Sequence, residues 1–568
     1  MSGWDTMGDI LPFRADYYPV LGQIMSEIDV AGTINNVVDA DDSQSKIDVG
    51  TFVCLMIHNL LGDVNIRLYD MSGFFEDKAL PLLVPWKPGI SLDEINDDRA
   101  ARVLDAVWNA DPQKIFSAIA NRVIYIHELD TSIIHGDTTS ISFHGMFDDL
   151  DLNPFIPVIT HGHNKDHRPD LKQLVFGVGT TADGVPVAAE VADGNESDKT
   201  LNGRWVKTLK SVLGKDIEDF LLYVADSALI TTPNLNLMDE YHIDFISRLP
   251  GNFGIEEELK RKAFLKDKWD YLGKLSDKKN AAIYQSCEMT GKIDDKTYRF
   301  IVIQSDKKDK RKLKTLDRAV KREHATIAKA LEELKKRPFA CKRDAEIEVK
   351  KFIKENDVKY HITDWEIEEK TEKVKREKRG RPKKNEKIQT QTNYYLNGNL
   401  QLDDKAYEMD RAICGLFVLI TSLMNIEKRS SNDILQRYKG QGNVERIFKF
   451  IKNPAWIGSF CLNTPSRIAA LGYIVLIAAM IYTLWERNIR KALSDSEEEP
   501  IEGLNRQKTK RPTTYALQKV MSSILVLSQI TDGKVESIWL PKPLKPNQEH
   551  ILQLTGFSKE IYTYASNV

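Results

Sequence analysis

A chain of 568 residues is too long for one compact core, so we expect two to four domains. Hydrophobic residues make up 42% and charged residues 29%, a composition that is typical of a globular, soluble protein and excludes a fibrous chain. The net charge of −3 is unevenly spread: residues 1–110 hold 7 Lys and Arg against 18 Asp and Glu, whereas residues 301–384 hold 28 against 17. A polyanion partner for the middle of the chain would explain its positive charge, and so would a solvated helical arm.

The five cysteines are scattered and show no C-x-x-C spacing, which suits a reducing cytoplasm and indicates neither a disulfide framework nor a zinc site. The first residues lack the basic start of a signal peptide. The longest uncharged run, residues 469–485, only just reaches the length of a membrane span, and Arg467 and Glu486 flank it. We therefore expect a buried core helix here, no membrane contact, and a cytoplasmic protein.

Residues 1–128 show mainly the 3.6-residue period of helices, with a break at Asp111-Pro112. From about residue 129 the pattern alternates as in strands, and the chain up to residue 250 predicts three strands, a helix near 197–214 and two more strands. The fourth strand, in FLLYVADSAL, is a continuous apolar run, which is typical of a strand buried on both faces. This order predicts a mixed sheet that begins with antiparallel strands and continues through a parallel crossover. It is the order of a ribonuclease H-like core flanked by helices.

Residues 251–405 interrupt this order as a basic insertion with three predicted strands and a long charged helix near 307–337. The apolar stretch 412–424 predicts a helix, and the acidic run 494–500 predicts a linker. We therefore predict five segments: a mainly helical N-terminal domain at 1–128, the first part of the α/β core at 129–250, the insertion at 251–405, the second part of the core at 406–493, and a linker with a C-terminal region at 494–568.

Two aspartates fall at the expected centre of the sheet. Asp137 lies in the first predicted strand, and Asp226 ends the buried one. Because these strands are neighbours in such a core, the two carboxylates would meet and could hold hard divalent cations. Phosphodiester chemistry uses this arrangement, since one cation activates the attacking oxygen and another stabilises the leaving oxygen. A structural role would explain either residue alone, Asp226 as a helix cap and Asp137 as a polar residue on a strand.

The stretch YKGQGNVERIFKFIKN, residues 438–453, predicts a basic amphipathic helix. Glu445 lies seven residues after Tyr438 and seven before Lys452, which places all three on one side of such a helix. A solvated helix face would give the same pattern. A third carboxylate on a helix packed across the sheet would complete the cation site, and Glu445 is the natural candidate.

With these motifs in this order, the chain resembles the DDE transposases of bacterial and archaeal insertion sequences, in the group with a Tyr-Arg-Glu-Lys signature (the insertion sequence family four type). The signature spaces Tyr, two residues, Arg, three residues, Glu, six residues and Lys. Tyr438, Glu445 and Lys452 match it, and Gln441 stands at the Arg position. The segments HGDTTS, GVPVAAEVADGNESD and VADSA are also similar.

The resemblance covers about residues 129–250 and 405–490, and it implies that Asp137, Asp226 and Glu445 bind two Mg²⁺ or Mn²⁺ ions. The implied reaction is hydrolytic nicking at the ends of the element, followed by attack of the freed 3′-OH on target DNA in cut-and-paste transposition. The implied partners are double-stranded DNA, as terminal inverted repeats and as target, and a second copy of the chain in a synaptic complex. The implied location is a prokaryotic cytoplasm, at the nucleoid when DNA is bound.

The same signature segment is expected to contact DNA. Tyr438 and Lys452 would touch phosphates at the transposon end, with Arg446 as a further basic residue of the segment. Gln441 has neither the charge nor the fork geometry of an arginine, which puts that one phosphate contact in question.

Two further segments carry weaker signals. Arg379 and Arg381 lie in RGRP, which resembles the core of an AT-hook that enters an A·T minor groove; general phosphate contact or a flexible loop would explain them equally. His161, His163 and His167 invite a zinc interpretation, but no cysteine or paired histidine helix supports it. We expect instead that this loop orders near the DNA or the metal ions.

Two rival functions remain open. A non-catalytic DNA-binding protein derived from a transposase would bind DNA without cleaving it, and Gln441 is its only support. A stand-alone ribonuclease H-like nuclease would cut by structure and need no terminal sequence. The intact acid triad argues against the first, and the large insertion argues against the second. The acidic character of residues 1–110 opposes the end-reading role that the resemblance gives to the N-terminal domain.

Overall fold

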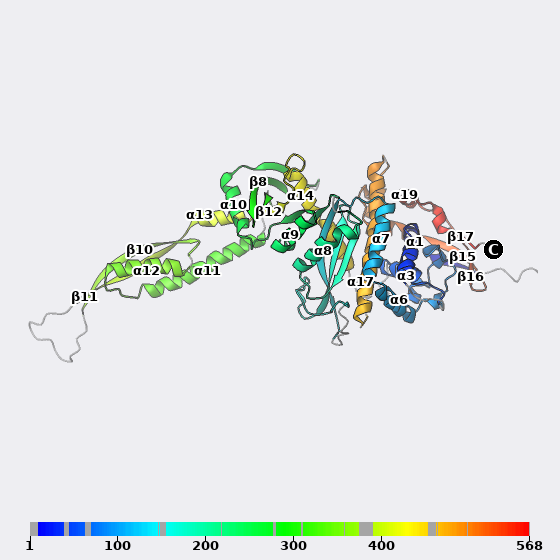
Figure 1. Ribbon diagram of the computed structural model, residues 1–568, viewed down its shortest axis with the longest axis horizontal. Helices are drawn as coiled ribbons and strands as arrows, with labels where there is room; N and C mark the ends of the chain where they lie inside the picture. The colour runs from blue at the N-terminus through cyan, green and yellow to red at the C-terminus, as the bar shows by residue number, and fades with distance from the viewer. Residues whose placement is uncertain are drawn as a thin grey trace, which may run out of the picture. The chain divides into compact units, whose positions relative to one another are not determined.

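The computed structural model describes residues 9–38, 45–62, 70–145, 147, 155–216, 219–276, 280–307, 310–356, 358–373, 390–452, 462, 464–496 and 498–566. The chain forms two compact units. The first unit comprises Met1–Arg248, Ile293–Asp295 and Thr421–Val568, and the second unit comprises Leu249–Lys292 and Lys296–Ile420. The chain therefore leaves the first unit after the strand that ends at Arg248 and returns to it before the predicted glutamate helix (Figure 1).

The first unit is built around strands in the order β4-β3-β2-β5-β6. Their bounds are β2 (Ile133–Phe143), β3 (Lys172–Thr181), β4 (Pro186–Ala192), β5 (Leu222–Ala225) and β6 (Asp244–Arg248). The pairs β2–β3 and β3–β4 are antiparallel, whereas β2–β5 and β5–β6 are parallel. The predicted mixed sheet of a ribonuclease H-like core is confirmed.

Local sequence explains where these elements begin and end. Gly184 has a φ of +88°, and this left-handed residue turns the chain between β3 and β4. The crossover helix α8 (Asp198–Val212) begins after Ser197, whose hydroxyl accepts the backbone N–H of Thr200 at 3.2 Å. It ends before Gly214, which is also left-handed. The helix predicted near 197–214 is thus confirmed, and α9 (Thr232–Glu240) then links β5 to β6.

A single long helix, α17 (Pro465–Asp495), runs through the core of the first unit. By length and composition it could cross a membrane, but 89% of its most apolar 18-residue window is buried inside the protein, as expected of a core helix. A Cβ atom at Gly472 would lie 2.9 Å from the ring of Phe176, so the helix approaches β3 as closely as a glycine permits. Trp485, near the other end, is fully buried.

The N-terminal region is helical, as expected, with a break at Asp111-Pro112 that Asp111 caps by accepting two backbone N–H groups. Its helices are α1 (Tyr18–Glu27), α2 (Val30–Val37), α3 (Val49–Leu60), α4 (Met71–Phe75), α5 (Leu80–Leu83), α6 (Asp97–Asn109) and α7 (Pro112–Ile126).

The two ends of the chain share one sheet, which no local pattern predicted. Strand β1 (Asp9–Arg14) pairs antiparallel with β15 (Leu525–Thr531). Blue and red segments consequently lie side by side in Figure 1. The sheet order is β1-β15-β16-β17. The other C-terminal elements are β13 (Ile501–Glu502), β14 (Lys508–Thr509), α18 (Thr514–Met521), β16 (Lys534–Trp539), α19 (Pro546–Thr555) and β17 (Tyr564–Ala565).

The second unit contains strands in the order β12-β9-β8-β7 and a separate β10–β11 hairpin. Its elements are α10 (Gly254–Lys266), β7 (Asp270–Lys274), β8 (Ile283–Ile293), β9 (Lys296–Ser305), α11 (Lys310–Leu334), α12 (Lys342–Glu355), β10 (His361–Lys373), β11 (Thr390–Leu402), α13 (Asp404–Ile413) and β12 (Leu416–Thr421). The three strands and the long helix predicted for the insertion are confirmed.

The helix predicted at 412–424 is wrong. Helix α13 ends at Ile413, and Leu416–Thr421 forms strand β12 instead. A short apolar run has the same appearance in a buried strand and in a buried helix, so periodicity could not separate them. The β-branched residues Val418, Ile420 and Thr421 were the local sign of a strand.

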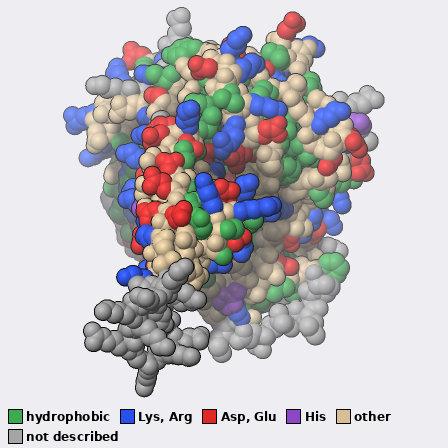
Figure 2. Space-filling model, turned by 90° about the vertical axis from the view of Figure 1, so that its left-hand side faces the viewer, with side chains coloured by type: hydrophobic (Ala, Val, Ile, Leu, Met, Phe, Trp, Pro, Cys, Tyr) green, Lys and Arg blue, Asp and Glu red, His purple; other side chains and the backbone are tan. Residues whose placement is uncertain are grey.

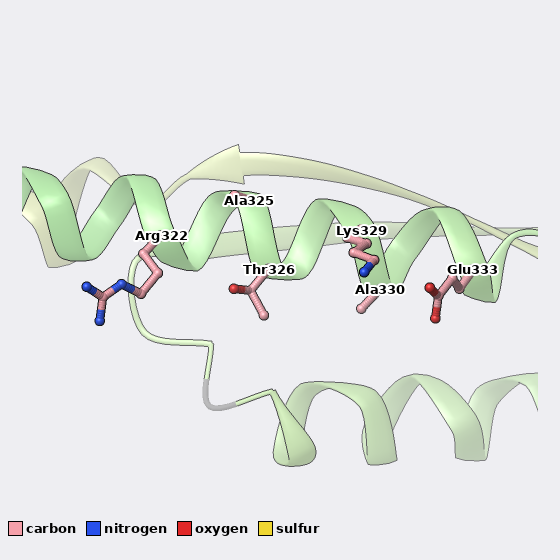
Figure 3. A pocket seen from close by; sticks show the side chains of 6 residues that line it. All are labelled: Arg322, Ala325, Thr326, Lys329, Ala330 and Glu333. Carbon is pink, nitrogen blue, oxygen red and sulfur yellow. The ribbon is translucent and has the colours of Figure 1, made fainter.

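The surface of the insertion mixes both signs of charge. Figure 2, in which the side with β10 and β11 faces the viewer, shows Lys and Arg interspersed with Asp and Glu. Helix α11 also borders a shallow groove of about 450 Å³ (Figure 3). Its lining residues are Arg322, Ala325, Thr326, Lys329, Ala330 and Glu333. One acid among two bases does not form a carboxylate cluster, so this groove offers no alternative cation site.

Candidate active site

The parallel register of β2 and β5 brings the two predicted aspartates together. Gly136 lies opposite Ala225, so the next residue on each strand, Asp137 and Asp226, falls at the same end of β5. A Cβ atom at Gly136 would lie 2.2 Å from the hydroxyl oxygen of Tyr223, so only glycine leaves room for this buried ring. Sequence, register and packing thus converge on one pair of carboxylates.

Burial makes the charged form of Asp137 unfavourable. Its pKa rises to about 6, chiefly because the carboxyl is removed from water, and the negative charge of Asp226 adds to the rise. The ammonium group of Lys165 acts in the opposite direction, as does the backbone N–H of Thr138, which donates to Oδ1 of Asp137 at 2.7 Å. Asp137 is therefore a carboxylate that a nearby cation would stabilise.

Asp226 lies in a similar environment at the end of β5. Its side chain accepts the backbone N–H of Ala228 at 3.0 Å and so caps a short helical turn. Burial again raises its pKa, with the Ala228 hydrogen bond opposing the rise and the charge of Asp198 adding to it. The cap that the sequence suggested as a structural role is therefore real, but it does not offset burial.

These two carboxylates fit a hard divalent cation. They are oxygen donors on neighbouring strands, at the level where β5 ends, and each is destabilised as an anion by burial and by neighbouring acids. Within the described part of the chain, however, no three His, Cys, Asp or Glu side chains are grouped so that they could hold a metal ion. The aspartate pair is thus in place, whereas a closed trio with Glu445 is not.

The signature segment forms two helices, so the single helix predicted for residues 438–453 is wrong. Helix α14 (Ser431–Lys439) ends just after Tyr438, and α15 (Gly442–Ile451) begins three residues later and carries Glu445 in its first turn. Only Gly440 and Gln441 lie between the two helices. A Cβ atom at Gly440 would lie 2.7 Å from the ring of His135, so glycine permits the close approach to β2. Tyr438 and Glu445 therefore come from different helices.

Tyr438 nevertheless connects the three predicted acids. Burial raises the pKa of its hydroxyl, Arg248 lowers it, and the charges of Asp226, Asp137 and Glu445 each raise it further. The Tyr438 hydroxyl is therefore within electrostatic reach of all three carboxylates. Glu445 itself is exposed in the first turn of α15.

The predicted DNA contacts lie on or beside α15. Lys452 donates from Nζ to Asp166 at 2.7 Å, and Arg446 pairs with Glu486 at 3.1 Å. The side-chain nitrogen of Gln441 is buried and has no hydrogen-bond partner among the described residues. Arg379 and Arg381 lie outside the described residues, so the AT-hook stays a prediction.

Sequence reasoning missed two residues of this site. Lys165, in the histidine-containing loop, and Asp198, the first residue of α8, both act electrostatically on the aspartate pair. The histidines of this loop suggested a zinc site, whereas the residue that acts on the aspartate pair is Lys165, between His163 and His167. No spacing rule could have joined Lys165 to Asp198, because they lie in separate elements.

Two family models match parts of the chain. A family model described as "Transposase DDE domain" matches residues 155–481, and one described as "Domain of unknown function (DUF4277)" matches residues 13–121. The first match includes Asp226 and Glu445 but begins after β2, which carries Asp137.

No curated protein matches the chain. Among solved structures, the cryo-EM structure of a piggyBac transposase synaptic complex with hairpin DNA is similar at 10% sequence identity and a TM-score of 0.35. That match covers 91% of this chain and 83% of the other. The transposase family model spans more than half of the 568 residues. The chain therefore belongs to the DDE transposases, enzymes that cleave DNA and transfer its strands.

Proposed function

We propose that this transposase cuts DNA at the ends of an insertion sequence and joins the freed 3′-OH to target DNA by a cut-and-paste route. The observation that carries the proposal is the parallel register of β2 and β5, which brings Asp137, within β2, beside Asp226, directly after β5, with Tyr438 within electrostatic reach of both and of Glu445. Each of the three acids belongs to a different segment of the chain, so folding is needed to bring them together.

The family generally depends on divalent metal ions. Asp137 and Asp226 would hold two Mg²⁺ ions, or Mn²⁺ in their place, and Glu445 would complete the ligand set from α15. Bound there, the ions would lower the pKa of the attacking oxygen and stabilise the leaving oxygen. The chain itself supplies the ionised carboxylates, and the mutual repulsion of the two aspartates favours occupation by a cation.

Basic residues of α15 would orient the DNA. Lys452 is 21% exposed and forms its ion pair with a half-exposed partner, Asp166, so a phosphate could replace that carboxylate. Arg446 is 47% exposed and lies one residue after Glu445. Tyr438 would donate from its hydroxyl to a phosphate oxygen, since its raised pKa keeps it protonated at neutral pH. Gln441 would contribute at most a neutral hydrogen bond.

The proposed partners are terminal inverted repeats, target DNA and a second copy of the chain in a synaptic complex. Cleavage of two DNA ends requires two catalytic centres held together, which favours a homodimer. The proposed location is a prokaryotic cytoplasm. The domain boundaries given above and the end-binding role of residues 1–128 are part of the same proposal.

The test is cleavage of labelled duplex that carries the DNA flanking the gene, with and without Mg²⁺. We expect metal-dependent cuts at one defined boundary, and loss of at least a hundredfold in rate for Glu445→Ala and Asp226→Asn. Glu427→Ala is the matched control, because Glu427 is an exposed acid in the loop before α14. Binding without cuts, in Mg²⁺ and in Mn²⁺, would favour a non-catalytic derivative. Cuts at unrelated branched structures, with no terminal preference, would favour a stand-alone nuclease.

A further inference from the structure

Lys165 has a fully satisfied ammonium group next to the aspartate pair. Its Nζ donates to the carbonyl oxygen of Thr138 at 2.6 Å and to the Thr138 hydroxyl at 2.7 Å, and it lies 3.2 Å from Oδ2 of Asp198. An ammonium group has three donors, and here each has an acceptor. Thr138 directly follows Asp137, so this cation is anchored to the strand residue beside the first acid.

The loop that carries Lys165 is itself held on β2. Asn164 donates from its side chain to the hydroxyl of Ser142 at 2.8 Å, and the backbone N–H of Lys165 donates to the hydroxyl of Ser140 at 3.2 Å. Asn164 is buried, and its side chain also accepts two backbone N–H groups of its own loop. The ammonium is therefore presented by an ordered segment and not by a free surface side chain.

Asp198 is a fourth acid within reach of the proposed metal site. It starts α8, accepts the Thr138 hydroxyl at 2.5 Å, and its charge acts on both Asp137 and Asp226. One ammonium and one further carboxylate thus act electrostatically on the aspartate pair.

We propose that Lys165 and Asp198 form a positioning pair that sets the affinity of the aspartate site for divalent cations. The charge of the ammonium weakens cation binding at the neighbouring pair, and the carboxylate of Asp198 partly neutralises that charge. The inference rests on the proposed function, because it presupposes that Asp137 and Asp226 bind the metal. It adds a residue pair and a role that the transposase signature does not contain.

Charge explains why the pair is placed there. A site that binds its cations too tightly would exchange them slowly, and a built-in ammonium limits that affinity. One positive charge about 6 Å from a divalent cation weakens binding about tenfold even at the dielectric constant of water. An ordinary ion pair with both side chains 30% exposed would instead affect stability slightly and metal affinity not at all.

The experiment measures Mn²⁺ affinity of the full-length protein without DNA, by the electron paramagnetic resonance signal of free Mn²⁺. We expect Lys165→Met to bind Mn²⁺ about tenfold more tightly than the natural protein, because a repelling charge is lost and the charge of Asp198 is no longer neutralised. Asp198→Asn should bind about tenfold less tightly, because the ammonium then lacks its counter-ion. The double variant should return to within about threefold of the natural protein, and Lys165→Arg should stay within about threefold of it.

Lys207→Met is the matched control, because Lys207 is an exposed lysine on the same helix as Asp198. Thermal unfolding of each variant shows whether it is folded, and Asp198→Asn keeps the test valid if Lys165→Met does not fold. If the natural protein binds Mn²⁺ and Lys165→Met binds it with equal or lower affinity, this inference is wrong and the proposed function stands. Unchanged Mn²⁺ affinity with weaker DNA binding would make Lys165 a phosphate contact and overturn it too. Natural protein that binds no Mn²⁺ overturns the proposed function and this inference with it.

Discussion

Replacing Asp137 by Asn should stabilise the metal-free protein at neutral pH. Burial and the charge of Asp226 raise the pKa of Asp137 from 3.8 to about 6, so the folded protein holds a carboxylate that is less favourable than in the unfolded chain. The amide has the same shape, carries no charge, and its oxygen can still accept the N–H of Thr138.

The expected gain in the free energy of unfolding follows from the shift in the pKa of Asp137. Two pKa units correspond to an upper limit of about 3 kcal/mol, and partial exposure of the side chain reduces this to about 1–2 kcal/mol. In the natural protein, the group's contribution to stability is greatest below pH 3.8 and is lost as the pH rises through about 6. The advantage of Asp137→Asn should therefore be complete near pH 8 and small near pH 4.

The assay is thermal unfolding in a metal chelator at pH 5 and at pH 8. The first unit holds roughly 400 residues, so 1–2 kcal/mol corresponds to a rise of about 1–3 °C in its transition. Asp532→Asn is the control, since Asp532 is exposed in the turn between β15 and β16. Added Mn²⁺ should then raise the transition of the natural protein more than that of the variant. A transition that falls at pH 8, or a gain of equal size at both pH values, would refute the reasoning.

Three further perturbations test other parts of the structure. Gln441→Arg should tighten binding to duplex DNA about fivefold and steepen the slope of log K against log salt by about 0.9, measured by fluorescence anisotropy; an unchanged slope would mean that position 441 does not reach a phosphate. Gly136→Ala should cost about 1–3 kcal/mol, because its Cβ would overlap the Tyr223 hydroxyl; an unchanged denaturation midpoint would show that the ring has room. Arg467→Ala should cost less than about 1 kcal/mol in the same assay, because its ion pair with Asp105 is 32% and 42% exposed; a larger loss would show a rigid, stabilising pair.

The sequence predicted the order of the core elements because each has a strong local signal. Strand β2 alternates, β5 is continuously apolar, and α8 begins with a serine cap and ends before a glycine. The handedness and adjacency of parallel strands then place Asp137 beside Asp226, as the register of β2 and β5 confirms. The two aspartates were accessible to sequence reasoning because each terminates or interrupts an otherwise regular pattern.

Other features were ambiguous in any local reading. Residues 416–421 are apolar enough for a buried helix or a buried strand, and only their neighbours in the second unit decided for β12. Tyr438 and Glu445 have the seven-residue spacing of the signature, but they lie on different helices, α14 and α15. Their spacing therefore does not place them on one helix face.

The amino-acid sequence by itself determined which residues form strands and helices and which acids stand at their ends, because backbone period, caps and turns depend on neighbours within a few positions. Only the tertiary structure decided which distant groups share one environment. It pairs β1 with β15 across most of the chain, and it brings Lys165 to Asp198 and both to the aspartate pair. The raised pKa of Asp137 has the same origin, since the burial of its carboxyl exists only in the folded protein.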